Sequence, residues 1–400
     1  MGRGRYAQLV LVLGALIALG PLTIDMYLPA FPALAEELGA SDSATQLTLT
    51  GMLAGLAVGQ LVIGPLSDAF GRRRPLLVGL VAHALASVLC AVAPSIEILA
   101  AVRVLQGFSG AAISVVAMAV VRDLFDGVEV ARVISRLMLV IGLAPILAPS
   151  LGAVILQWTS WRGIFGVLAV AALVLVVVAA LGLRETLPPE RRRTARVGDI
   201  LSTYRSLLAD RTFVALVLMG GLMMSTIFAY VSGSSFVLQD GFGLSEQTFG
   251  LVFGLNSIGL TIFSQINPML LRRWRVVDVL TGALAVSVSA AAVLLVVGLT
   301  GWGGLLAVLV PLAVIVSAAG LSLPNTPALA LTRHGEAAAT AAALLGCAQF
   351  GIGALVAPLV GAFGSTTAAP MAAVMLGVSA AAMALLVLVV RRDETAANLR

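Results

Sequence analysis

The chain has 400 residues, of which 60% are hydrophobic and only 11% are charged, and its mean hydropathy is +1.08. A soluble domain has about 45–50% apolar and about 25% charged residues, so this composition excludes a soluble protein. The net charge of +5 comes from 24 arginines and no lysine, set against 19 acids. Because the arginines flank apolar segments, this charge indicates membrane topology and not nucleic-acid binding.

Twelve apolar segments of helix length follow one another along the chain, and each can span a bilayer, which takes about 20 residues. They lie at 7-30, 45-66, 75-93, 97-121, 133-157, 162-183, 212-238, 247-271, 277-299, 303-331, 338-363 and 368-390. The sequence therefore predicts an all-α membrane protein with twelve transmembrane helices. The first segment is overlong and interrupted by Asp25, Pro29 and Pro32, so we do not expect a cleaved signal peptide.

A polar connection at residues 184-211 separates the first six spans from the last six. We expect it to be a cytoplasmic linker between an N-terminal six-helix bundle (1-183) and a C-terminal six-helix bundle (212-400), although a solvated basic loop would have the same composition. Residues 142-153 in span 5 align without gaps on residues 351-362 in span 11. This echo predicts two pseudo-symmetric halves, as in transporters whose site lies between repeats near the membrane midplane.

Arginine placement predicts the orientation. If both termini and the even-numbered connections share one side, that side receives 21 of the 24 arginines, and only Arg162 falls in a loop on the other side. The positive-inside rule then places both termini in the cytoplasm of a multi-pass protein in the plasma or inner membrane.

Asp25 lies in the first segment with no Arg, Lys or His beside it in the sequence. A carboxylate at membrane depth costs roughly 2.5–3.5 kcal/mol, so such a residue is a functional candidate that faces a cavity or the bundle interior. Since Asp25 comes about 18 residues into the segment, the alternative is an acid that caps a helix end near the far headgroups.

The loop between spans 2 and 3 contains Gly64, Asp68, Gly71, Arg72 and Arg73. The two glycines permit a tight turn and close backbone approach, and Asp68 can pair with an arginine at the end of a neighbouring helix. We expect a cytoplasmic gate here, with Arg122 at the inner end of span 4 as the partner of Asp68. Three arginines at a membrane edge are also ordinary topology anchors.

Spans 4 and 5 carry further patterns. Arg103 and Gln106 recur with Gly110 at helical spacing, so one stripe of span 4 carries a charge and an amide. Span 5 places Pro145 and Pro149 among small residues, between Gly142 and Gly152.

These motifs resemble the major facilitator superfamily, and specifically the bicyclomycin and chloramphenicol/florfenicol exporter branch (Bcr/CflA) of its twelve-span drug:proton antiporters. The resemblance is specific at 23-30, 64-76, 103-111, 121-123 and 135-153 and weaker in the second half. It implies that Arg103 takes part in proton coupling with Asp25. It also implies that Gly142, Pro145, Pro149 and Gly152 form the motif that marks exporters, although Ala144 replaces the family's usual glycine.

Several polar, aromatic and methionine side chains inside spans would suit an adaptable substrate cavity if they face it. The candidates are Met26, Tyr27, Gln106, Met118, Met138, Phe228, Tyr230, Asn256, Asn325 and Gln349. The amides have an alternative role, because interhelical amide hydrogen bonds commonly hold membrane helices together.

We expect a proton-coupled exporter of amphipathic drugs or related small molecules that works by alternating access. The alternatives are a substrate-specific uptake symporter on the same fold and a non-transporting membrane receptor. No nucleophile-base or metal-ligand grouping indicates an enzyme, and we expect no cofactor besides the coupling proton. The expected partners are the drug, protons and the lipid bilayer, with no nucleic acid, and the expected state is a monomer.

Overall fold

The computed structural model describes residues 3–192, 197–334, 337–362 and 366–393. Within these residues, twelve helical segments are long and apolar enough to cross a membrane, which confirms the predicted number. The helices of the first half are α1 (Arg3–Asp25), α2 (Phe31–Glu37), α3 (Asp42–Phe70), α4 (Arg73–Ala91), α5 (Ile96–Leu124), α6 (Val128–Leu156) and α7 (Trp161–Gly182). They are followed by α8 (Val197–Ala209), α9 (Arg211–Phe236), α10 (Glu246–Leu270), α11 (Val276–Thr300), α12 (Gly304–Arg333), α13 (Ala338–Ala362) and α14 (Ala368–Leu385).

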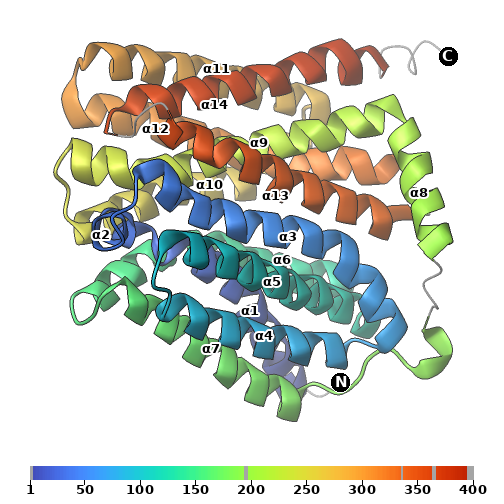
Figure 1. The fold of residues 1–400 in the computed structure, drawn as a ribbon. Coiled ribbons are helices and arrows are strands. Elements are labelled where there is room, and N and C mark those ends of the chain that lie inside the picture. Colours follow the sequence, from blue (N-terminus) through green and yellow to red (C-terminus); the bar gives the residue numbers. More distant parts are fainter. Residues whose placement is uncertain (1–2, 193–196, 335–336, 363–365, 394–400) are drawn as a thin grey trace.

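The long helices lie side by side in two groups (Figure 1). Helices α1 to α7, here called the N-terminal helices, pack mainly through α3 on α5, α4 on α7 and α1 on α6. Helices α9 to α14, the C-terminal helices, pack through α9 on α13, α11 on α14 and α10 on α12. Between the groups, α3 packs on α13 and α6 packs on α10.

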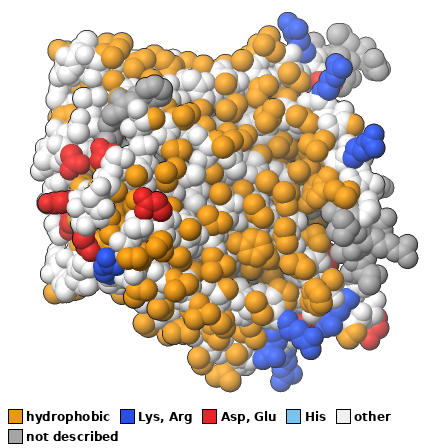
Figure 2. Space-filling model, in the orientation of Figure 1, with side chains coloured by type: hydrophobic (Ala, Val, Ile, Leu, Met, Phe, Trp, Pro, Cys, Tyr) orange, Lys and Arg blue, Asp and Glu red, His pale blue; other side chains and the backbone are white. Residues whose placement is uncertain are grey.

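The two ends of the molecule differ in charge. Both chain ends and α8 lie at the end where the arginine side chains gather in Figure 2, which we call the arginine-rich end. Acidic side chains gather at the opposite, acid-rich end, and hydrophobic side chains cover the surface between. An apolar belt between two polar ends is the surface that a bilayer requires, and the cytoplasmic placement of the arginine-rich end is a prediction from the positive-inside rule.

Four helices begin at the acid-rich end with a serine cap. The side chains of Ser41, Ser95, Ser160 and Ser245 each accept a hydrogen bond from a backbone N–H in the first turn that follows. Such caps satisfy N–H groups that have no partner within the helix.

The first predicted span is longer in the structure and is broken after Asp25, nearer to its end than to its start. Helix α1 ends at Asp25, a short 3₁₀ turn η1 (Leu28–Ala30) follows, and α2 continues to Glu37. Pro29 and Pro32 lack backbone N–H groups, so the helical hydrogen bonds to the carbonyls of Asp25 and Leu28 cannot form. The break therefore leaves backbone carbonyls without helical partners beside Asp25.

A small polar cluster joins the end of α2 to the start of α7 and the end of α4. Glu37 accepts hydrogen bonds from Trp161 Nε1 at 2.7 Å and from Arg162 Nη2 at 3.0 Å. Arg162 Nη1 also donates to the carbonyls of Ala91 and Ala93. Arg162, the single arginine expected in an outer loop, therefore holds three helix ends together.

Candidate functional site

Asp25 is buried at the break in the first span, with 5% of its surface exposed. Its carboxylate makes no hydrogen bond or ion pair with any residue that the structure describes. The groups that face this part of the chain are Arg103 and His83 on one side and Tyr230 on the other. Asp25 therefore remains a candidate for a proton carrier, since an acid that is buried in a span without a partner is costly and rarely kept without a role.

Arg103 on α5 is fully buried and does not reach Asp25. Its guanidinium donates to Gln106 Oε1 at 2.7 Å, to the Thr23 carbonyl at 3.1 Å and to the Thr48 carbonyl at 3.4 Å. It also lies over the Tyr27 ring, 4.2 Å from the centroid. Its Nη2 has no partner in the described part of the chain. The positive charge is thus held by carbonyls, an amide and an aromatic face, which is an expensive arrangement in a low-dielectric interior.

The geometry of the first span separates the two charged residues. Thr23 and Tyr27 are four residues apart and lie on the face of the span that contacts Arg103, whereas Asp25 lies about 200° around the helix from Thr23. Arg103 therefore contacts one side of the span, and the Asp25 side chain lies on the other side.

His83 on α4 extends the polar network behind Asp25. One ring nitrogen lies 3.2 Å from Thr23 Oγ1, and the other lies 3.3 Å from the Gln106 carbonyl and from Ser109 Oγ. Both ring nitrogens thus have structural partners, as expected for a satisfied core histidine.

Tyr230 on α9 approaches Asp25 from the C-terminal helices. The Asp25 carboxylate lies within range for a direct electrostatic effect on its phenol. The phenol oxygen accepts a hydrogen bond from Asn256 Nδ2 at 3.1 Å, and its ring stacks on Phe253 at 4.8 Å between centroids. Because the oxygen accepts from Asn256, the phenol proton is available to an acceptor such as an ionised Asp25.

The predicted exporter motif on α6 contacts the break in the first span on one side and α10 on the other. A Cβ at Gly152 would lie 1.8 Å from the Met26 carbonyl oxygen, so only glycine allows this approach to the break in the first span. On the opposite side, Thr261 Oγ1 of α10 donates to the Gly142 carbonyl at 3.0 Å. Pro145 and Pro149 lie between these contacts, where Gly250 of α10 approaches the Pro149 carbonyl.

The remaining candidate cavity residues lie in different surroundings. Tyr27 and Gln106 belong to the Arg103 network, and Asn325 forms a reciprocal amide pair with Asn267, at 3.1 and 2.8 Å. Phe228 packs on Phe350 of α13. The others are Met26, which is buried, Met118 and Gln349, which are half-buried, and Met138, which is exposed. Tyr230 and Asn256 are thus the polar candidates that the structure brings near Asp25.

Hydrogen bonds join the N- and C-terminal helices at the acid-rich end. Ser235 Oγ and Gln239 Nε2 of the α9 region donate to the carbonyls of Leu28 and Pro29, which lie at the break in the first span. Gln46 of α3 donates to the Ser232 carbonyl and accepts from the Gly361 N–H. The two groups of helices are therefore closed against each other at this end.

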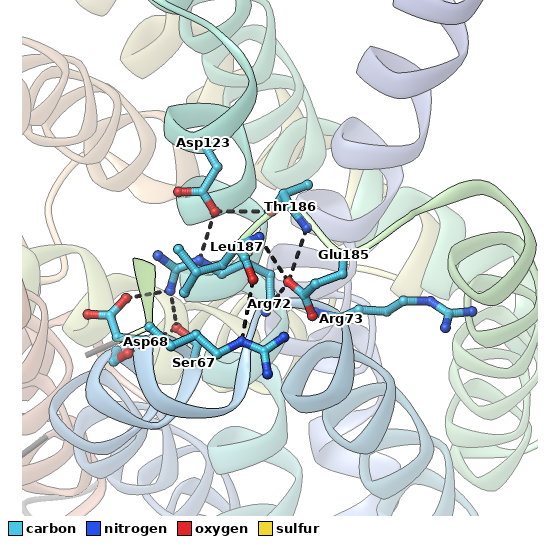
Figure 3. Close-up of polar contacts among 10 residues, drawn as sticks. Ser67, Asp68, Arg72, Arg73, Asp123, Glu185, Thr186 and Leu187 are labelled. Carbon is cyan, nitrogen blue, oxygen red and sulfur yellow. Dashed lines mark hydrogen bonds and ion pairs between the residues drawn. The ribbon is translucent and has the colours of Figure 1, made fainter. Parts of the chain in front are cut away.

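A charged cluster occupies the arginine-rich end (Figure 3). Arg72 forms ion pairs with Asp68 and, at 2.9 Å, with Asp123 of α5, and it donates to Ser67 Oγ at 2.7 Å. The expected pair between Asp68 and Arg122 is not formed. Arg122 is exposed, because the neighbouring residue Asp123 occupies the side of α5 that faces the turn between α3 and α4.

The linker contributes to this cluster through Glu185 and Thr186, which the sequence reasoning missed. Burial lowers the pKa of Arg72, but its bonds to Asp123 and Asp68 outweigh burial and raise the pKa above its usual value. Asp123 directly follows Arg122 in the sequence, but nothing in the sequence shows which of these two side chains faces Arg72. Glu185 had no signal beyond being an acid in an arginine-rich linker.

The chain is similar to known proteins over most of its length. Residues 13–358 match the sequence profile of the Major Facilitator Superfamily. The chain is 42% identical to the uncharacterized MFS-type transporter YdgK of Bacillus subtilis, over 94% of this chain and 93% of the relative. It is 31% identical to a bicyclomycin resistance protein homolog of Haemophilus influenzae, over 90% and 91% of the two chains. The crystal structure of a D-xylose-proton symporter superposes with a TM-score of 0.71 at 16% identity, over 95% of this chain and 96% of that one.

Proposed function

The chain belongs to the major facilitator superfamily, and from this premise we propose that it exports amphipathic small molecules across the membrane in exchange for protons. Membership makes it a multi-pass membrane transporter and not an enzyme. The relative named for bicyclomycin resistance supports a drug as the cargo.

The observation that carries the proposal is the buried, unpartnered carboxylate of Asp25 at the interface between the two groups of helices. With Arg103 turned to the other side of the span, no described cation neutralises Asp25, so a proton or a substrate group must do so whenever the site is shielded from water. Competition between those two occupants is the basis of exchange. Phe228, Tyr230, Asn256 and Gln349 are the cavity residues we propose on the C-terminal side, with Met26, Met118 and Met138 opposite them.

Proton entry provides enough free energy for this work. Moving one charge through 100 mV supplies about 2.3 kcal/mol, which sustains a roughly 50-fold gradient of a neutral drug before any pH difference is added. Efflux is therefore expected to stop when a protonophore collapses the proton gradient.

The decisive experiment measures proton release when bicyclomycin or chloramphenicol is added to the purified protein in weakly buffered solution. We expect release from the wild type and none from Asp25→Asn, which preserves shape but cannot titrate. Glu36→Gln, which removes an exposed acid at the acid-rich end, is the matched control and should release protons normally. Release of wild-type size from Asp25→Asn would assign the carrier role to another group, and inward accumulation in energised vesicles would indicate a symporter.

A further inference from the structure

The linker after α7 begins with a carboxylate that binds the turn between α3 and α4. Glu185 accepts four backbone N–H bonds, from Arg72 at 2.7 Å, Arg73 at 3.2 Å, and Thr186 and Leu187 at 3.0 Å each. The first two donors lie at the start of α4, which has no capping side chain of its own. Glu185 therefore caps α4 from a distant part of the chain, where a negative charge also suits the helix dipole.

Glycine at position 71 makes room for this carboxylate. Gly71 has a φ of 88°, and a Cβ there would lie 2.4 Å from Glu185 Oε2. The positive φ and the close approach both require glycine. The turn is thus shaped to accept Glu185 as well as to reverse the chain.

The next linker residue, Thr186, completes a ring of hydrogen bonds that includes Arg72. Thr186 Oγ1 donates to Asp123 Oδ2 at 3.0 Å, and the same oxygen accepts from Arg72 Nε. Figure 3 shows the linker lying across the cluster, with these bonds on both sides of Arg72. The ring joins the start of the linker, the turn between α3 and α4, and the inner end of α5.

The far end of the linker belongs to the other group of helices. Helix α8 packs on α9 and α13, and Tyr204 of α8 also donates to the Leu61 carbonyl of α3 at 3.5 Å. Residues 185 to 187 bind the N-terminal helices and α8 packs on the C-terminal helices, so a displacement between the two groups changes the separation between these two described parts of the linker.

We propose that Glu185 is a positioning residue through which the linker sets the geometry of the Asp68, Arg72 and Asp123 cluster and transmits movement of the C-terminal helices to it. The role rests on the proposed function only in assuming that the two groups of helices move relative to each other. It needs neither a particular drug nor proton coupling.

Glu185 keeps its charge through the physiological range. Burial by itself raises the pKa of Glu185, but the four backbone N–H groups lower it below its usual value. A depressed pKa means that the interaction is fully present above the unfolded-state value and is lost only as the pH falls through the folded-state value. The strap formed by residues 185 to 187 therefore does not respond to protons near neutral pH, which separates its role from that of Asp25.

The test uses the full-length protein in lipid nanodiscs, with Cys90 and Cys347 replaced by serine and spin labels at Leu124 on α5 and Thr332 on α12. The distance between the labels reports opening at the arginine-rich end. Glu185→Gln keeps the size of the side chain but removes its charge and turns one acceptor into a donor that faces an N–H group. We expect the ratio of open to closed populations to change at least tenfold, whereas Glu190→Gln, an exposed acid in the same linker, leaves it unchanged.

A purely structural cap would lower thermal stability without changing that ratio, so melting is measured on the same samples. Thr186→Val breaks only the hydrogen bond to Asp123 and replaces Glu185→Gln in the test if that variant does not fold. We expect it to change the ratio of open to closed populations in the same direction, but by less. A folded Glu185→Gln or Thr186→Val variant with the wild-type ratio overturns the proposal. Failure of proton release at Asp25 leaves this readout unaffected, so the two proposals fail separately.

Discussion

Gly152→Ala tests whether the exporter motif on α6 acts by fitting against the break in the first span. The new Cβ would lie 1.8 Å from the Met26 carbonyl oxygen, and because such contacts are not found below 3.0 Å, α6 or the break must move by at least about 1.2 Å. Overpacking of this kind costs typically 1–3 kcal/mol. The displaced backbone belongs to the residue next to Asp25, so the strain falls on the proposed carrier site.

If that strain applies in only one of the transporter's conformations, it shifts the equilibrium between them by roughly 5- to 150-fold. We therefore expect drug efflux per folded molecule to decrease by roughly 5- to 150-fold, measured in proteoliposomes with an imposed pH gradient. The matched control is Gly20→Ala in α1, where a Cβ would meet nothing within 4 Å and where alanine favours the helix. Wild-type efflux and wild-type thermal stability in Gly152→Ala would refute this packing argument.

Three further variants test other contacts. Arg103→Lys keeps the charge but loses the fork that holds two carbonyls and an amide, so we expect a loss of about 1.5–3 kcal/mol in stability for each charged hydrogen bond lost, measured by thermal melting. Asp68→Asn should slow efflux at least tenfold while membrane insertion, followed by immunoblot, stays normal; unchanged efflux would reduce this acid to a topology anchor. Tyr230→Phe removes the phenol donor that interacts electrostatically with Asp25, so drug-induced proton release should have its midpoint at a higher pH. Tyr6→Phe, which removes a buried hydroxyl without a described partner, should leave that midpoint in place.

The twelve spans were predictable because a segment of about 20 apolar residues has few stable alternatives to a membrane helix. Asp25 could be identified as a candidate from the sequence, since a lone acid among apolar neighbours is costly, and the structure places it in a buried position. Its isolation from Arg103 was not predictable, because that depends on which side of α1 faces α5. The sequence shows both residues but not the rotation of one helix against another.

The charged cluster shows the same limit. Gly71 and Arg72 lie in a recognisable loop, but their partners Asp123 and Glu185 come from positions 51 and 113 residues away from Arg72. A single sequence contains no signal for contacts at such separations. Arg122 has the charge that the expected pair with Asp68 requires, but its neighbour Asp123 makes the contact with Arg72. One position on a helix changes the direction of the side chain by about 100°.

The bonds that close the acid-rich end have no ionisable member. Serine and glutamine side chains donate to the backbone carbonyls of Leu28, Pro29 and Ser232, and each such neutral bond contributes about 0.5–1.5 kcal/mol. The closure therefore does not titrate, and added salt screens it little, in contrast to the ionic cluster at the other end. Its total is also comparable with the free energy that one entering proton supplies. The barrier that these bonds form would thus keep the same strength when the acidity or the salt concentration at that end of the molecule changes.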